Sequence, residues 1–182
     1  MKNLYFVAPE IFISISIMFL LILGVFKKNS PKIIHNLSMV FLIITGILIL
    51  NNPLDAKITL FKDSFIIDNL SSFMKTLTIL AGVVVLSIST KYLKKFKIFL
   101  IEYPILILCS ILGMLVMISS NDLMVFYLGL ELQSLALYVL ASFNRDQLKS
   151  SESGLKYFVL SALSSGLLLY GCSLIYGFFG ST

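Results

Sequence analysis

One carboxylate lies near the middle of a long apolar run. Between Leu123 and Phe143 the only formally charged residue is Glu131. An ionised side chain at the centre of a bilayer costs about 2.5–3.5 kcal/mol on insertion scales, so such a group is retained when it is paired, hydrated or protonated. A residue of this kind is a functional candidate by default, and its chemistry is the uptake and release of a proton. The alternative is a glutamate that joins two helices by hydrogen bonding.

Three polar residues share the helical face of Glu131. Tyr127 lies four positions before it, Ser134 three positions after it and Tyr138 seven positions after it. The helical repeat places all of them on one side. The opposite face carries Leu, Met, Val and Ala and suits lipid or apolar helices. These spacings predict a polar seam around a relay carboxylate.

Two lysines inside apolar segments are further candidates. Lys156 lies in the first turn of the last segment, where the helix macrodipole opposes its charge, a placement that suits a proton-relay lysine. The alternative is a lysine that reaches the headgroups. Lys75 lies inside the third segment and is expected to face protein or water, as a secondary relay or part of a polar seam. The depths of Glu131 and Lys156 predict no direct contact, although water could link them.

The composition is that of an integral membrane protein. Charged residues make up 13 % and hydrophobic residues 58 %, whereas a soluble domain carries about a quarter charged residues. Residues 1–182 are therefore expected to form one all-α polytopic transmembrane domain. Strands are not expected, because the alternating pattern of a membrane barrel is missing. Six segments are long enough for a hydrocarbon core of about 30 Å: 4–26, 33–50, 66–90, 103–120, 123–143 and 154–179.

Basic residues are distributed unevenly between the connections. The connections after the first, third and fifth segments carry Lys27, Lys28, Lys32, Lys91, Lys94, Lys95, Lys97, Arg145 and Lys149. The opposite side carries Lys2, Lys57 and Lys62. The positive-inside rule then places the first set in the cytoplasm or matrix, and both termini on the periplasmic or intermembrane-space side. The net charge of +5 is thus a topology signal. It leaves room for anionic lipid and needs no nucleic acid.

The remaining reactive side chains predict neither a cofactor nor a metal site. Cys109 and Cys172 lie inside apolar runs, and an iron–sulfur cluster usually needs four cysteines. No catalytic residue is predicted in this chain. Three acidic residues near segment ends are expected at the membrane interface rather than in a relay: Glu10, Asp68 and Glu102. His35, at the start of an apolar run, is expected at a helix end or at the interface rather than in a metal or catalytic site.

Three stretches carry a family resemblance: Ser119–Met124, Tyr127–Ala141 and Ser151–Gly171, with Glu102-Tyr103-Pro104 before them. They closely resemble subunit 2 of the proton-pumping NADH:ubiquinone oxidoreductase, respiratory complex I, which is chain N in bacteria. The N-terminal half matches only as three hydrophobic helices of suitable spacing.

The resemblance implies an antiporter-like membrane-arm subunit that takes part in proton translocation, with Glu131 and Lys156 as its relay residues. It implies part of an enzyme rather than a catalyst alone, because FMN, iron–sulfur clusters, NADH and ubiquinone would be handled by other subunits. Family members usually have fourteen helices. The expected partners are therefore other membrane-arm subunits and a separate chain with the missing C-terminal helices, unless the sequence is a piece of a longer protein.

Two alternative functions stay open. The chain could be a purely structural membrane module of the same complex, or a subunit of a related cation/proton antiporter. Its Lys-, Ile- and Phe-rich composition favours an AT-rich organellar genome and hence the mitochondrial inner membrane, with the bacterial plasma membrane as the alternative.

Overall fold

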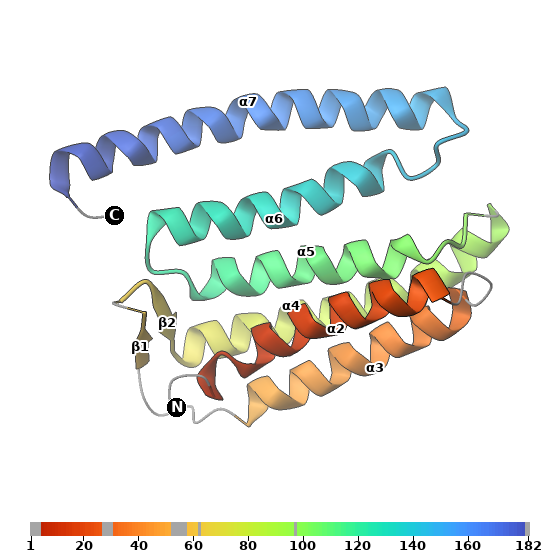
Figure 1. Ribbon diagram of the computed structural model, residues 1–182, viewed down its shortest axis with the longest axis horizontal. Helices are drawn as coiled ribbons and strands as arrows, with labels where there is room; N and C mark the ends of the chain where they lie inside the picture. Colours follow the sequence, from red (N-terminus) through yellow and green to blue (C-terminus); the bar gives the residue numbers. More distant parts are fainter. Residues whose placement is uncertain (1–4, 27–30, 52–57, 62, 97, 181–182) are drawn as a thin grey trace.

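The computed structural model describes residues 5–26, 31–51, 58–61, 63–96 and 98–180. Six helices in this part are long and apolar enough to cross a membrane, which confirms the predicted all-α polytopic fold (Figure 1). They are α2 (Ala8–Phe26), α3 (Pro31–Leu50), α4 (Asn69–Lys95), α5 (Glu102–Ser119), α6 (Leu123–Ala141) and α7 (Leu148–Phe179).

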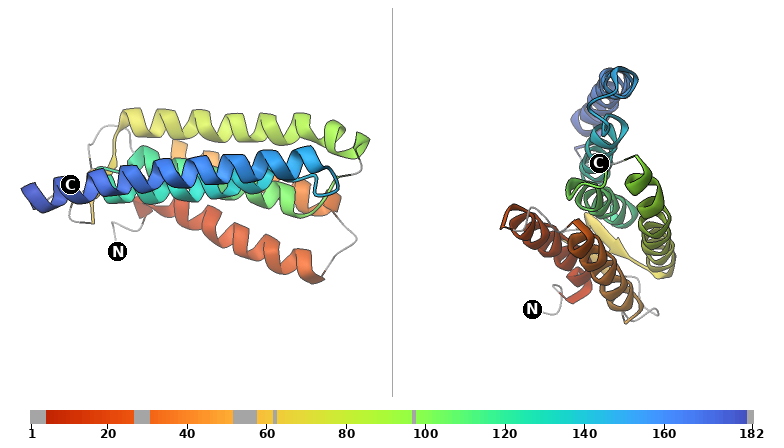
Figure 2. Two further views of the ribbon diagram at one scale, coloured as in Figure 1. Left: turned by 90° about the horizontal axis from the view of Figure 1, so that it is seen from above. Right: turned by 90° about the vertical axis from the view of Figure 1, so that its right-hand side faces the viewer.

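Helices α2 to α5 form a four-helix unit, and α6 and α7 follow it in a row. Helices α2 and α4 lie on opposite sides of the unit, and each packs against both α3 and α5. Helix α6 packs on α5, and α7 packs on α6, so α7 lies farthest from the unit (Figure 2). The unit is held by one apolar cluster, whose fully buried members are Ile13, Leu20, Leu42, Leu86, Leu108 and Leu115.

Polar residues set the starts of two helices. The Asp68 carboxylate accepts from the Ser71 backbone N–H at 2.7 Å, and the Ser71 hydroxyl accepts from the Asp68 N–H, which forms a capping box at α4. The Asp122 carboxylate caps α6 by accepting from the Met124 N–H at 2.7 Å. Asp68 is therefore a helix cap, which is a more specific role than the interfacial anchor predicted from the sequence.

The expectation of no strands is wrong for one short connection. Strands β1 (Ile58–Leu60) and β2 (Phe65–Ile67) pair as an antiparallel hairpin between α3 and α4. The predicted third segment began at residue 66, inside β2, whereas α4 begins at Asn69. The turn contains two residues with positive φ, Phe61 (52°) and Asp63 (68°). Asn121, just before α6, donates its side-chain amide to the Asp63 carbonyl at 2.7 Å and so joins the hairpin turn to this connection.

Two glycines allow α5 and α6 to pack closely. A Cβ atom at Gly113 would lie 2.6 Å from the Gln133 nitrogen, and one at Gly129 would lie 2.9 Å from the Met117 nitrogen. Both neighbours are backbone atoms, so a larger residue could not be accommodated by a side-chain movement. The short connection after Ser119 and this close contact confirm the predicted antiparallel pair of helices.

The two ends of the molecule differ in charge. The described basic residues of the connections lie where α2, α4 and α6 end, which we call the basic end: Lys32, Lys91, Lys94, Lys95, Arg145 and Lys149. The β-hairpin lies at the opposite end, here called the hairpin end, where α7 also finishes (Figure 1). This segregation is the pattern on which the predicted orientation rests.

Candidate functional site

Glu131 lies near the middle of α6, on the side turned away from α5. Its residue is partly buried, and its carboxylate oxygen Oε1 is buried with no hydrogen-bond partner among the described residues. Gly129 and Gln133, which meet α5, are each two positions away and hence on the opposite helical face. A buried carboxylate oxygen without a partner is energetically costly, so Glu131 remains a candidate for a role beyond packing.

The predicted polar seam is formed only in part. The Ser134 hydroxyl donates to the backbone carbonyl of Glu131 at 3.1 Å, not to its carboxylate. Tyr138 is buried and packs edge-on against two rings of α7, with centroid distances of 4.9 Å to Tyr157 and 5.6 Å to Phe158. Because Tyr138 is two helical turns from Glu131 on the same face, this face of α6 is turned toward α7.

Within the described residues, the Lys156 side chain does not contact Glu131. Its ammonium group pairs at 2.6 Å with the carboxylate of Glu152, one turn earlier in α7, and both side chains are more than half exposed. An exposed pair of this type contributes little to stability. Lys156 is therefore free to exchange this partner for another.

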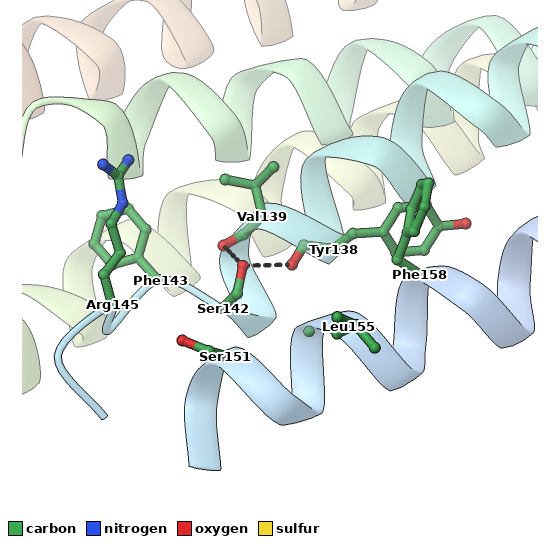
Figure 3. Close-up of a pocket in the computed structure, with 9 residues that line it drawn as sticks. Tyr138, Val139, Ser142, Phe143, Arg145, Ser151, Leu155 and Phe158 are labelled. Carbon is green, nitrogen blue, oxygen red and sulfur yellow. Dashed lines mark hydrogen bonds between the residues drawn. The ribbon is translucent and has the colours of Figure 1, made fainter. Parts of the chain in front are cut away.

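A cleft opens between the end of α6 and the start of α7, at the basic end. It has a volume of about 490 Å³. Tyr138 and Phe158 lie at one end of the cleft, and Phe143 and Arg145 lie at the other (Figure 3). The Ser142 hydroxyl lines it and bonds to the Tyr138 carbonyl at 3.2 Å. The cleft thus reaches from the basic end to the residue that shares a face with Glu131.

Lys75 and Glu10 form a buried ion pair, of which the sequence predicted only the environment of Lys75. Lys75 faces protein, as expected, and its ammonium group forms an ion pair of 2.5 Å with Glu10. The expectation that Glu10 is an interfacial anchor is wrong, because its residue is only 5 % exposed. The sequence did contain a sign of this pair. Both residues lie near the starts of segments that cross the membrane in the same direction, so their opposite charges lie at a similar depth and could meet.

His35 also differs from its expected position at the interface. It lies in the first turns of α3, as a helix-end residue should, but it is 2 % exposed. Its ring lies 5.7 Å from that of Phe99, in the segment before α5. Phe99 and the end of α4 cover His35, whereas the hydropathy pattern predicts that His35 lies at the surface. Glu102, in contrast, is exposed at the start of α5, as predicted.

Comparison with known proteins agrees with this arrangement. Residues 120–182 match the family model of the NADH:quinone oxidoreductase/Mrp antiporter transmembrane region. The whole chain is 80 % identical to NADH-quinone oxidoreductase subunit N of Pelagibacter ubique and covers 39 % of that protein. It is 45 % identical over 176 residues to subunit N of Paramagnetospirillum magneticum, where 97 % of this chain covers 36 % of the relative.

Solved structures share the fold at lower identity. A chain of the respiratory complex I from Thermus thermophilus, determined with bound aureothin, superposes with a TM-score of 0.79 at 24 % identity, over 95 % of this chain and 37 % of that one. A chain of an archaeal membrane-bound sulfane sulfur reductase gives a TM-score of 0.78 at 19 % identity, over 96 % of this chain and 37 % of that one. At these identities the likeness supports the fold alone.

The six membrane-length helices and the match of residues 120–182 identify an antiporter-like, multi-pass membrane subunit. More specifically, the chain belongs to the family of NADH-quinone oxidoreductase subunit N. It spans about two fifths of the length of the relatives it matches. These relatives come from bacteria and give no support to the mitochondrial location expected from composition.

Proposed function

We propose that this chain is part of a proton-translocating membrane subunit, in which Glu131 takes up and releases a proton while its complex transfers electrons from NADH to a quinone. The observation that carries the proposal is the buried Oε1 of Glu131, which lies inside α6 without a hydrogen-bond partner in the described chain. A carboxylate inside a membrane-spanning helix is retained when it is paired, hydrated or protonated, and a relay group passes between such states.

Water is the natural carrier of the proton to this group. The cleft beside Tyr138 begins at the basic end, and Glu131 lies about 10 Å farther along α6, at 1.5 Å per residue. Ser161 and Ser165 are partly buried on α7, on the side that meets α6. Lys156, at the mouth of this region, is the second relay candidate, because its exposed pair with Glu152 is readily exchanged.

The proposal includes partners that complete the path. Most of α7 is exposed, and the chain spans only part of its relatives. We expect the remaining helices, supplied by a separate chain or by the rest of a longer protein, to cover α7 and to provide a cationic partner for Glu131. FMN, iron–sulfur clusters, NADH and quinone would be bound by other subunits. Anionic lipid would contact the basic end, and a bacterial plasma membrane fits the relatives.

The substitution Glu131→Gln tests the proposal, because it keeps the size and removes the titrating group. In membrane vesicles that contain the assembled complex, proton pumping per NADH oxidised should fall. The matched control is Glu102→Gln, which neutralises an exposed carboxylate of the same chain. Unchanged pumping in an assembled Glu131→Gln complex would contradict the relay role. Loss of assembly without loss of pumping per complex would favour a structural module instead.

A further inference from the structure

We propose that Glu10 and Lys75 form a second proton-exchange site, separate from Glu131, at the hairpin end of the four-helix unit. The inference rests on the proposed function of the chain in proton translocation. The two side chains meet at 2.5 Å and come from α2 and α4, which lie on opposite sides of the unit. Both residues are almost fully buried, with exposed fractions of 5 % and 3 %.

The pair is incompletely satisfied. Of the two carboxylate oxygens of Glu10, Oε1 accepts from Lys75, and Oε2 is buried without a hydrogen-bond partner among the described residues. The Lys75 ammonium group lies 5.2 Å from the ring centroid of Phe65, which offers only a cation–π contact. A buried ion pair with open hydrogen-bonding capacity is often no more stable than apolar residues of the same size. Stability alone therefore does not explain these charges.

The pair lies close to one end of the unit only. Glu10 is in the first turn of α2, and Lys75 lies about 9 Å from the start of α4. The hairpin covers it with an apolar cluster of Leu60, Phe65 and Ile67. Ser119, at the end of α5, carries a further buried hydroxyl without a partner in the described chain. An enclosed water could satisfy such unpartnered oxygens, and the hairpin end is the nearer side from which it could enter.

Toward the other end, the next turn of both helices is apolar. One turn below the pair, Ile13 of α2 and Ile79 of α4 are buried, and both belong to the apolar core of the unit. No polar group of these two residues could carry a proton farther. The geometry thus points to the hairpin end as the side with which the pair exchanges the protons that the subunit moves.

The transfer itself is a simple acid–base step. An N–H bond of the Lys75 ammonium breaks and an O–H bond forms on Glu10 Oε1, which leaves a neutral amine beside a neutral acid. No electrons are transferred. In this neutral form the site no longer buries two charges, whose removal from water is costly. When a hydronium ion then donates a proton to Oε2, the O–H bond at Oε1 breaks and its proton returns to Lys75 Nζ, which leaves a protonated lysine beside a neutral acid and a neutral water. Loss of the Oε2 proton to water restores the ion pair.

Other charged groups at this end have their own partners or face solvent. Asp68 and Asp122 cap α4 and α6 through the Ser71 and Met124 N–H groups. Asp63 is exposed in the hairpin turn. Lys75 and Glu10 are thus the acid–base pair that the described part of the chain buries inside the four-helix unit.

The test compares a double variant, in which both residues of the pair are neutral, with a single variant, in which only one is changed. Both are made in the complete complex. Lys75→Gln alone leaves a buried carboxylate unpaired and should lower the amount of assembled complex. The double variant Glu10→Gln/Lys75→Gln removes both charges but keeps hydrogen bonding, so it should assemble. We expect it to lose part of its proton pumping per NADH oxidised. Thr45→Val is the control, because Thr45 is buried in the same unit and bonds within its own helix, to the Phe41 carbonyl.

Each outcome separates this inference from the proposed function. Normal pumping by the double variant, with reduced pumping by Glu131→Gln, would overturn the second site alone. Normal pumping by both variants would overturn the proposed function as well. If the Gln pair and a Glu10→Gln/Lys75→Met pair both fail to assemble while the charge-swapped Glu10→Lys/Lys75→Glu pair assembles, the ion pair is structural and the inference fails.

Discussion

Two buried carboxylates of this chain lie in contrasting environments. Glu131 has a buried oxygen without a described partner, whereas Glu10 is held by Lys75 at 2.5 Å. The first can be controlled by a group that approaches from outside the described helices, and the second has its own base beside it. The two carboxylates therefore call for different variants: a single neutral residue at Glu131, and a neutral pair at Glu10 and Lys75.

Tyr138 gives a stability prediction at the residue scale. Tyr138→Ala removes ring contacts to Tyr157 and Phe158, and aromatic pairs of this type contribute about 0.5–1.5 kcal/mol each. Helix α7 should then be held less firmly to α6. The complex with Tyr138→Ala should lose its native-gel band at a lower temperature than the wild type. Tyr138→Phe keeps the ring and should match the wild type; an equal loss in both variants would show that ring packing is not the cause.

The type of each residue and its place in the sequence predicted the environments of some ionisable residues but not of others. Glu131 stands out because it is the only charge in its apolar run, and Asp122 because a carboxylate before a helix is a common cap. Glu10 and His35 were misplaced, because hydropathy places charged residues near segment ends at the interface. Their burial is caused by the β-hairpin and by the segment around Phe99, which are tertiary features that a one-dimensional pattern does not contain.

At the scale of elements, the long helices were predictable and the hairpin was not. A run of apolar residues of membrane length has few structural alternatives. The hairpin strands are only three residues long, and Ile58–Leu60 and Phe65–Ile67 are too short for an alternating pattern to be recognised. The close contact of α5 and α6 was also missed, because isolated glycines such as Gly113 and Gly129 indicate packing only when their opposing positions are known.

The glycine contact yields a prediction for this helix pair. In Gly113→Ala the new methyl group would lie 2.6 Å from the Gln133 nitrogen and 2.7 Å from the Gly129 carbonyl oxygen, so α5 and α6 must separate. Overpacking of this kind costs about 1–3 kcal/mol. The yield of assembled complex and its midpoint of heat inactivation should both fall. Gly46→Ala is the control, because its methyl group would meet only a side-chain atom of Ile79 at 3.4 Å. Similar losses in both variants would contradict the contact argument.

At the scale of the molecule, the segregation of basic residues predicts the orientation. We expect the basic end on the cytoplasmic side and the hairpin end on the opposite side. Cysteines at Lys94 and Thr59, both exposed, would report the two ends after Cys109 and Cys172 are replaced. In inside-out vesicles a membrane-impermeant maleimide should label Lys94→Cys and should label Thr59→Cys only after detergent is added. The reverse pattern would invert the orientation.

Helix α7 is the least buried of the six membrane-length helices in the described chain. Helix α7 contacts the described chain mainly through one face, where Gly154, Tyr157, Phe158 and Cys172 approach α6. Under the proposed function, the exposed side of α7 is where further helices of the subunit would attach.

The most direct test of the account is whether this chain resides in an NADH-oxidising complex. Membranes solubilised in mild detergent would be separated on a native gel stained for NADH dehydrogenase activity, and the active band would be analysed by mass spectrometry. We predict that peptides of this chain occur in that band together with peptides that carry the remaining helices of the subunit. Recovery of the chain only in bands without this activity would contradict the account and would direct the next experiments to cation transport.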